Sequence, residues 1–197
     1  MIRTLLVMLL ATFGAATFAP AAHGSWQPPV AVGSSADPAS VVSSAGADGT
    51  AVVAWTSGGG VYASAKPSGS GFETPIHLGE GSQVQVAVDD QGEILVAWIG
   101  GSGVLFSTRP ASGGFSAAVS ALQVPGLTQL SVAANSSGRM LVAYASPTAR
   151  GLVTRPRGSS AFTSAWSTAE PVIHTSLSVT GGPGNDDAWV AWSDRDG

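Results

Sequence analysis

The sequence contains no cysteine and very little charge. Without cysteine the chain has no disulfide and no thiolate metal site, so burial and strand pairing alone must hold its fold. Charged residues make up 10% of the chain, against about 25% in average soluble domains. The net charge is −4 and there is no basic stripe. Because phosphate affinity comes mostly from clustered lysine and arginine, we expect no nucleic-acid partner.

The first two dozen residues have the pattern of a secretory signal peptide. Arg3 gives a positive start, residues 5–19 are apolar apart from threonine and glycine, and small residues follow at 19–22. The apolar run is shorter than the roughly 20 residues that a membrane span needs, which favours a cleaved signal over an uncleaved anchor. We predict that residues 1–23 are a signal peptide and that residues 24–197 are secreted, with no membrane span after cleavage.

A repeat of about four dozen residues occupies the rest of the chain. Each copy has an apolar strand that ends in an aromatic residue, and these aromatics lie 43, 46 and 48 residues apart. The four anchor aromatics are Trp55, Trp98, Tyr144 and Trp192. Period-two alternation and glycine-rich or aspartate-rich turns divide a copy into four short strands. In the second copy the predicted strands are 83–88, 93–98, 104–109 and 115–119.

The period and the strand number predict an all-β fold, a β-propeller-like array of four-stranded antiparallel blades. One such sheet cannot bury both of its faces alone, so neighbouring sheets must stack on it. The predicted blades are residues 37–80, 81–124 and 125–172, with a partial blade at 173–197. Residues 25–33 resemble the fourth strand of a blade and are predicted to be a closing strand. About three and a half blades indicate either a truncated propeller, which we favour, or an incomplete ring.

These repeats resemble those of secreted bacterial sialidase-like (BNR-type) β-propeller proteins. The resemblance covers residues 25–197 and rests on the succession of apolar strand, aspartate-containing turn, Val-Ala-Trp, glycine-rich turn and Gly-Phe-Ser. Residues 107–115 occupy the place of the family's Asp-box, Ser-x-Asp-x-Gly-x-x-Trp, but they lack its aspartate and are one residue longer. The family's enzymes use three arginines, a Tyr–Glu pair and an acid aspartate. No motif here matches that set, so the resemblance implies the fold and transfers no catalytic residue.

Several recurring residues are interpreted as structural. Lys66, Arg109 and Arg155 share one repeat position before a proline, which indicates a structural role. The aspartates at one recurring turn suit turn geometry, whereas a calcium site needs six to eight converging oxygens. These aspartates are Asp48, Asp89, Asp90, Asp186 and Asp187.

The other candidates for chemistry also have a simpler interpretation. The sequon that begins at Asn135 fills the same turn position, so it is interpreted as a turn. The glutamates Glu73, Glu80, Glu93 and Glu170 lie in no catalytic signature and are interpreted as solvated surface residues. The anchor aromatics are interpreted as core because they recur within apolar strands.

Four residues remain as candidates for ligand binding: Arg150, Trp166, Asp194 and Asp196. Trp166 holds the position of Ile76 and Val119 in the sister repeats, and Arg150 lies in a variable loop. Residues 194–197 resemble the opening of an Asp-x-Asp-Gly calcium loop, although an ordinary polar turn is favoured. The glycine runs join strands and open no helix, so we expect no phosphate loop and no cofactor.

Three functional hypotheses follow from these observations. The first is a secreted, non-catalytic propeller that binds an extracellular glycan, wall polymer or protein. The alternative is a fragment of a sialidase-like glycoside hydrolase whose catalytic residues lie in blades outside this sequence. The third is a structural or assembly role, because open strand edges favour self-association.

Overall fold

The computed structural model describes residues 29–33, 38–169, 174–181 and 188–194. The chain divides into two compact units, 1–30 and 31–197, and the fold below is that of the second. Its described residues form strands, turns and loops. Among them, no helix has the length and the apolar character that crossing a membrane requires.

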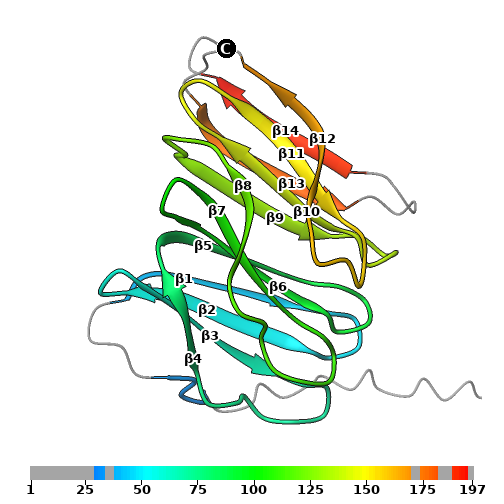
Figure 1. Ribbon diagram of the computed structural model, residues 1–197. Coiled ribbons are helices and arrows are strands. Elements are labelled where there is room, and N and C mark those ends of the chain that lie inside the picture. Colours follow the sequence, from blue (N-terminus) through cyan, green and yellow to red (C-terminus); the bar gives the residue numbers. More distant parts are fainter. Residues whose placement is uncertain (1–28, 34–37, 170–173, 182–187, 195–197) are drawn as a thin grey trace, which may run out of the picture. The chain divides into compact units, whose positions relative to one another are not determined.

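The strands form three four-stranded antiparallel sheets and one two-stranded sheet (Figure 1). Sheet 1 contains β1 (Pro38–Ala45), β2 (Ala51–Ser57), β3 (Gly60–Lys66) and β4 (Ile76–Glu80). Sheet 2 contains β5 (Ser82–Val88), β6 (Ile94–Gly100), β7 (Gly103–Arg109) and β8 (Val119–Gln123). Sheet 3 contains β9 (Gln129–Ala134), β10 (Met140–Ala145), β11 (Arg150–Arg155) and β12 (Thr163–Thr168). Sheet 4 contains β13 (His174–Gly181) and β14 (Ala188–Asp194).

Within each four-stranded sheet the strands lie side by side in chain order, so each repeat is a simple meander. The β2–β3 hairpin shows why the sequence turns where it does. Its two loop residues, Gly58 and Gly59, have φ angles of 58° and 86°. A two-residue hairpin of this kind needs positive φ at both positions, which glycine adopts without a steric penalty.

In the first two repeats the fourth strand begins later than the sequence predicted. The predicted strand 115–119 is observed as β8, which starts at Val119. The same pattern predicts the corresponding strand of the first repeat over residues 72–78, and it is observed as β4, which starts at Ile76. The preceding residues form a loop held by hydroxyl groups of the third strand. Ser64 Oγ donates a 2.6 Å hydrogen bond to the carbonyl of Glu73, and Ser107 Oγ donates a 2.7 Å bond to that of Ser116.

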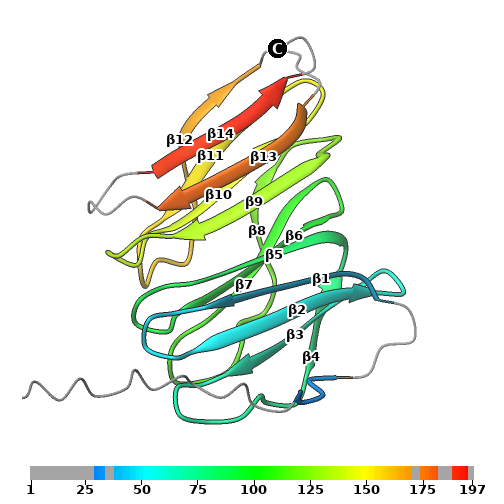
Figure 2. The same ribbon diagram turned by 180° about the vertical axis from the view of Figure 1, so that it is seen from behind.

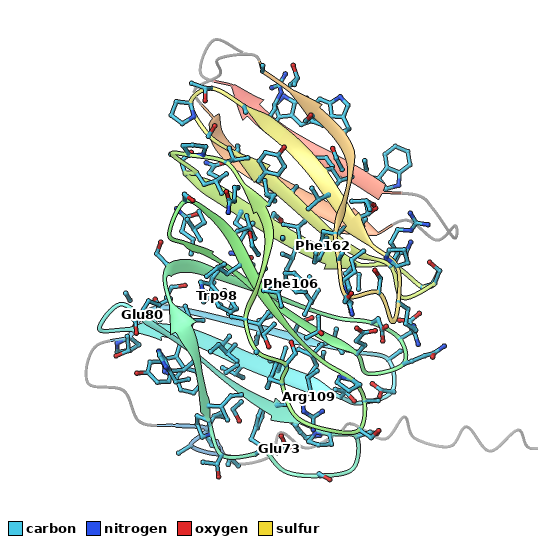
Figure 3. All side chains as sticks on the ribbon, in the orientation of Figure 1. Glu73, Glu80, Trp98, Phe106, Arg109 and Phe162 are labelled. Atoms are coloured by element: carbon cyan, nitrogen blue, oxygen red, sulfur yellow. The ribbon has the colours of Figure 1, made fainter. Side chains whose placement is uncertain are left out.

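The sheets pack together through shared apolar clusters. Sheets 1 and 2 share one cluster, sheets 2 and 3 share a second, and Leu141 and Ala143 of sheet 3 pack with Val190 of β14. The first strands of successive sheets, β1, β5, β9 and β13, lie next to one another (Figures 1 and 2). Phe106 of sheet 2 and Phe162, the residue before β12, pack edge to face with 4.9 Å between ring centroids (Figure 3).

Three of the four anchor aromatics lie in this core, as predicted. Trp98 is fully buried, and Trp55 and Tyr144 are nearly so. The Trp98 indole also donates a 3.1 Å hydrogen bond to the carbonyl of Glu80, the last residue of sheet 1. The anchor of one repeat is therefore tied to the end of the repeat before it. Of the predicted closing strand 25–33, the described residues 29–33 have no strand structure.

Candidate functional site

An exposed cluster of one arginine and two tryptophans spans sheets 3 and 4. The rings of Trp166 and Trp192 are stacked, with 5.8 Å between centroids and 14° between planes. The guanidinium carbon of Arg150 lies 4.4 Å from the centroid of the Trp192 ring. Trp166 and Trp192 nevertheless remain 41% and 38% exposed. The structure therefore brings together two of the predicted site residues, Arg150 and Trp166, and adds Trp192.

Local strand pairing places Trp166 at the surface. Trp166 lies opposite Leu152 on β12, as Ile76 lies opposite Ala63 and Val119 opposite Phe106 in the other sheets. All three side chains at this position are exposed. Trp166 is thus an exposed residue, and of these three repeats only the third uses a large aromatic side chain there.

The prediction that Trp192 is a core residue is wrong. Its equivalents Trp55, Trp98 and Tyr144 are buried, whereas Trp192 is not. The environments differ because the Trp98 ring is closely flanked by Gly79 and Gly81 of the preceding repeat. The nearest described aromatic neighbour of Trp192 in the preceding sheet is instead the large ring of Trp166, which stacks beside it.

Arg150 supports the tryptophan pair from the start of β11. Its Nε and Nη1 atoms are buried, while its guanidinium plane faces the Trp192 ring. A cation held over an indole face stabilises the ring by roughly 0.5–1 kcal/mol at exposed sites and more when it is desolvated. Arg150 therefore packs against Trp192, and the exposed indole surfaces are what a ligand could contact.

The two predicted aspartates cannot be placed in this cluster. Asp194 ends β14, where its backbone pairs with His174. Asp196 lies outside the described residues. Within the described part of the chain there is no group of three or more acidic, histidine or cysteine side chains that could hold a metal ion.

The recurring polar turn is a structural device. Asp48 accepts hydrogen bonds from the backbone and hydroxyl of Thr50, and Asp89 accepts backbone bonds from Gln91 and Glu93. Asn135, nearly fully buried, accepts bonds from residues 137 and 139 in the same way. The interpretation of these positions as turns is confirmed for Asp48, Asp89 and Asn135. Asp186 and Asp187 lie outside the described residues.

The repeated arginines link neighbouring sheets. Arg109 of sheet 2 pairs with Glu73 of sheet 1 at 2.7 Å (Figure 3). Arg155 of sheet 3 pairs with Glu93 of sheet 2 at 2.8 Å. Both guanidinium groups are buried, so the predicted structural role of this position is confirmed. The prediction that Glu93 is a solvated surface residue is wrong, because its side chain is 12% exposed and holds a buried cation.

A third ion pair lies beside the second. Arg157, which follows β11, places Nη2 2.7 Å from Oδ2 of the fully buried Asp89. A cavity of ≈ 440 Å³ opens on this charged edge between sheets 2 and 3, lined in part by Glu93, Arg155 and Arg157. Each cationic group there faces a carboxylate, so the charges already balance without a ligand.

Tyr144 takes the anchor position in the third repeat. It is nearly fully buried, and burial raises the pKa of its hydroxyl above the ordinary value for tyrosine. The neighbouring Gly151 leaves room for this hydroxyl, because a Cβ there would lie 2.5 Å from the Tyr144 oxygen. Its predicted place in the core is confirmed.

Comparison of the chain with models of known protein families and with curated proteins gives no match.

Proposed function

We propose that this protein is a secreted, non-catalytic β-propeller module that binds an extracellular glycan or wall polymer. The observation that carries the proposal is the exposed, stacked pair Trp166 and Trp192, with Arg150 over the second ring. Flat indole faces offer a large rigid contact surface at low entropic cost. They suit the apolar faces of sugar rings better than they suit small charged molecules.

Two further observations support the propeller part of the proposal. The three complete repeats are four-stranded antiparallel meanders, and the first strand of each lies next to the first strand of the following one. Blades arranged around an axis share this order of strands. Secretion is supported by the apolar N-terminal segment with its single arginine.

The hydrolase alternative finds no favouring observation among the described residues. Arg109, Arg155 and Arg157 each bind a carboxylate of the neighbouring sheet. Tyr144 is enclosed in the core. A partner protein, the third ligand class that the sequence allows, remains an outcome of the experiment below.

The test is co-sedimentation of the full chain with insoluble cellulose, chitin and peptidoglycan sacculi. If the proposal holds, at least one of these polymers retains the protein, and Trp166→Ala and Trp192→Ala each weaken that binding tenfold or more. Such a loss corresponds to about 1.4 kcal/mol, which is within the range for truncating a central aromatic contact. Arg150→Lys weakens it less, because an ammonium group keeps the charge but loses the planar stacking.

Val119→Ala is the matched control, because Val119 holds the position of Trp166 in sheet 2 and is also exposed. It should bind as the original chain does. Unchanged retention of both tryptophan variants, with the same melting temperature as the original chain, would remove the cluster as the binding site. Failure of all three polymers to retain the protein would argue against a wall polymer and favour a protein ligand.

A further inference from the structure

Two apolar faces of the described sheets are exposed although their counterparts in the other repeats are buried. The first is defined by Val41 and Val53 of sheet 1, beside the buried Trp55, and is called the rear face. The second is defined by Trp189 and Ala191 of β14 and is called the front face. Each interface between successive described sheets pairs a front face with a rear face.

The rear face is identified from the residue opposite each anchor aromatic. Val41 pairs with Trp55, and Leu130 pairs with Tyr144. In the β5–β6 pairing the register shifts between Ser82 and Gln85, and Val84 lies in this shifted segment, across from Trp98. Val84 and Leu130 are 0% and 6% exposed because the preceding sheet covers them, whereas Val41 is 63% exposed.

The front face is identified from the residue three positions before each anchor. These residues are Val52, Leu95, Leu141 and Trp189. The first three are 0%, 0% and 1% exposed, whereas Trp189 is 67% exposed. Side chains alternate between the two faces of a strand, and Val190 and Trp192 of β14 already contact sheet 3. Trp189 and Ala191 therefore point away from sheet 3.

The two faces match in chemistry as well as in position. In the first shared cluster, Val52 and Ala54 of one sheet pack with Val84 and Val96 of the next. A cavity of ≈ 290 Å³ opens on the rear face of sheet 1, lined in part by Val41, Val53 and Trp55. None of the described residues that line it carries a charge. The apolar indole of Trp189 matches the apolar lining of this cavity.

We propose that the front face of one copy of this chain packs on the rear face of a second copy. The occupant is a second copy because the interface required is the one that the chain already repeats between its own sheets. The contact is head-to-tail, so each copy can use both faces at once. Such a contact gives a closed ring if the rotation between copies closes, and an open chain of copies if it does not.

The experiment is analytical ultracentrifugation of the full chain. The protein is expressed with its N-terminal segment and purified after any cleavage that the cell carries out. The expected result is an oligomer at micromolar concentration. Val41→Lys and Trp189→Glu each place a charge in the contact, so each variant alone should sediment as a single chain. Val119→Lys makes the same change at an exposed strand residue outside both faces and should leave the oligomer intact.

Mixing the two variants provides a test that misfolding cannot mimic. The Val41→Lys chain keeps its front face and the Trp189→Glu chain keeps its rear face, so an equal mixture should form a 1:1 dimer. Four outcomes would overturn the proposal. The first is an original chain that stays monomeric throughout the micromolar range, and the second is an oligomer that survives either single variant. The third is a mixture of the two variants that stays monomeric, and the fourth is an oligomer that is lost with Val119→Lys.

Occupation of the rear face by residues 1–28, or of either face by a different protein, would appear as a monomeric original chain. These outcomes do not touch the polymer-binding proposal, because Val41 and Trp189 lie outside the Arg150, Trp166 and Trp192 cluster. Loss of polymer binding with an intact oligomer would in turn leave the head-to-tail contact standing.

Discussion

At the scale of single residues, repetition in the sequence separated structural positions from candidate ligand contacts. Arg109 and Arg155 recur before a proline, and both form buried ion pairs between sheets. Their acidic partners could not be predicted. Glu73 lies before the fourth strand of its repeat and Glu93 before the second, so the carboxylates come from different repeat positions and give no periodic signal.

The Arg155–Glu93 pair yields a prediction of stability. Glu93→Gln removes the charge that compensates the buried Arg155 guanidinium, and breaking such a pair from one side costs roughly 3 kcal/mol. Urea unfolding should show a free energy of unfolding lower by about that amount. Replacing both partners together, with Arg155→Met and Glu93→Leu, should cost less than the single change because no uncompensated charge remains.

The matched control for this prediction is Glu80→Gln. Glu80 is largely exposed, and its contact is with the half-exposed His77 at 3.3 Å. Exposed pairs of this kind contribute little, so its unfolding free energy should change by no more than about 0.5 kcal/mol. Equal losses in the two variants would contradict the structural role of the Arg155–Glu93 pair.

At the scale of strands and turns, the alternation of the sequence predicted most elements but not where fourth strands begin. The fourth strands of the first two repeats were predicted to start at Phe72 and Phe115. In the structure Phe115 packs on the first core cluster from a loop. Hydroxyl groups of the third strand help to hold this loop, beside a backbone hydrogen bond from Ser116 to Thr108, and such side-chain bonds leave no period in the sequence.

The turn at Asp89 gives a prediction at this scale. Asp89 Oδ1 accepts backbone hydrogen bonds of 2.8 and 2.9 Å, and the third repeat does the same with Asn135. Asp89→Asn should keep these bonds and lose only the ion pair with Arg157. Asp89→Ala removes the acceptor of the partly buried N–H groups of Gln91 and Glu93, and a lost partner of this kind costs up to about 1–3 kcal/mol. Thermal melting should therefore place the alanine variant below the asparagine variant, and the reverse order would refute the turn argument.

At the scale of the whole molecule, the spacing of four aromatic residues predicted the number and the order of the sheets. The prediction of the sheets was correct because, as in repeat proteins, each repeat contacts only its neighbours, so one sequence period describes all of them. Trp192 marks the limit of that logic. Periodicity assumes that every copy has the same neighbours, and the neighbour of Trp192 is the single large aromatic of an outer strand, Trp166.

The N-terminal segment supplies a prediction for the chain as a whole. Its apolar run and the small residues at 19–22 predict export and cleavage between residues 19 and 24. The intact mass of protein collected outside the producing cell should therefore match a chain that begins within residues 20–24. A mass that retains residue 1 would indicate an anchor instead.

Because the tryptophans differ in solvent exposure, intrinsic tryptophan fluorescence can report on binding to this protein. Trp55 and Trp98 are buried, whereas Trp166, Trp189 and Trp192 are open to solvent. Iodide in solution should therefore quench emission from the exposed set and leave the buried pair bright. Protection of Trp166 and Trp192 would then report on a bound polymer, and protection of Trp189 on a second copy. The two events can be followed separately, without a label, by comparing single-tryptophan variants.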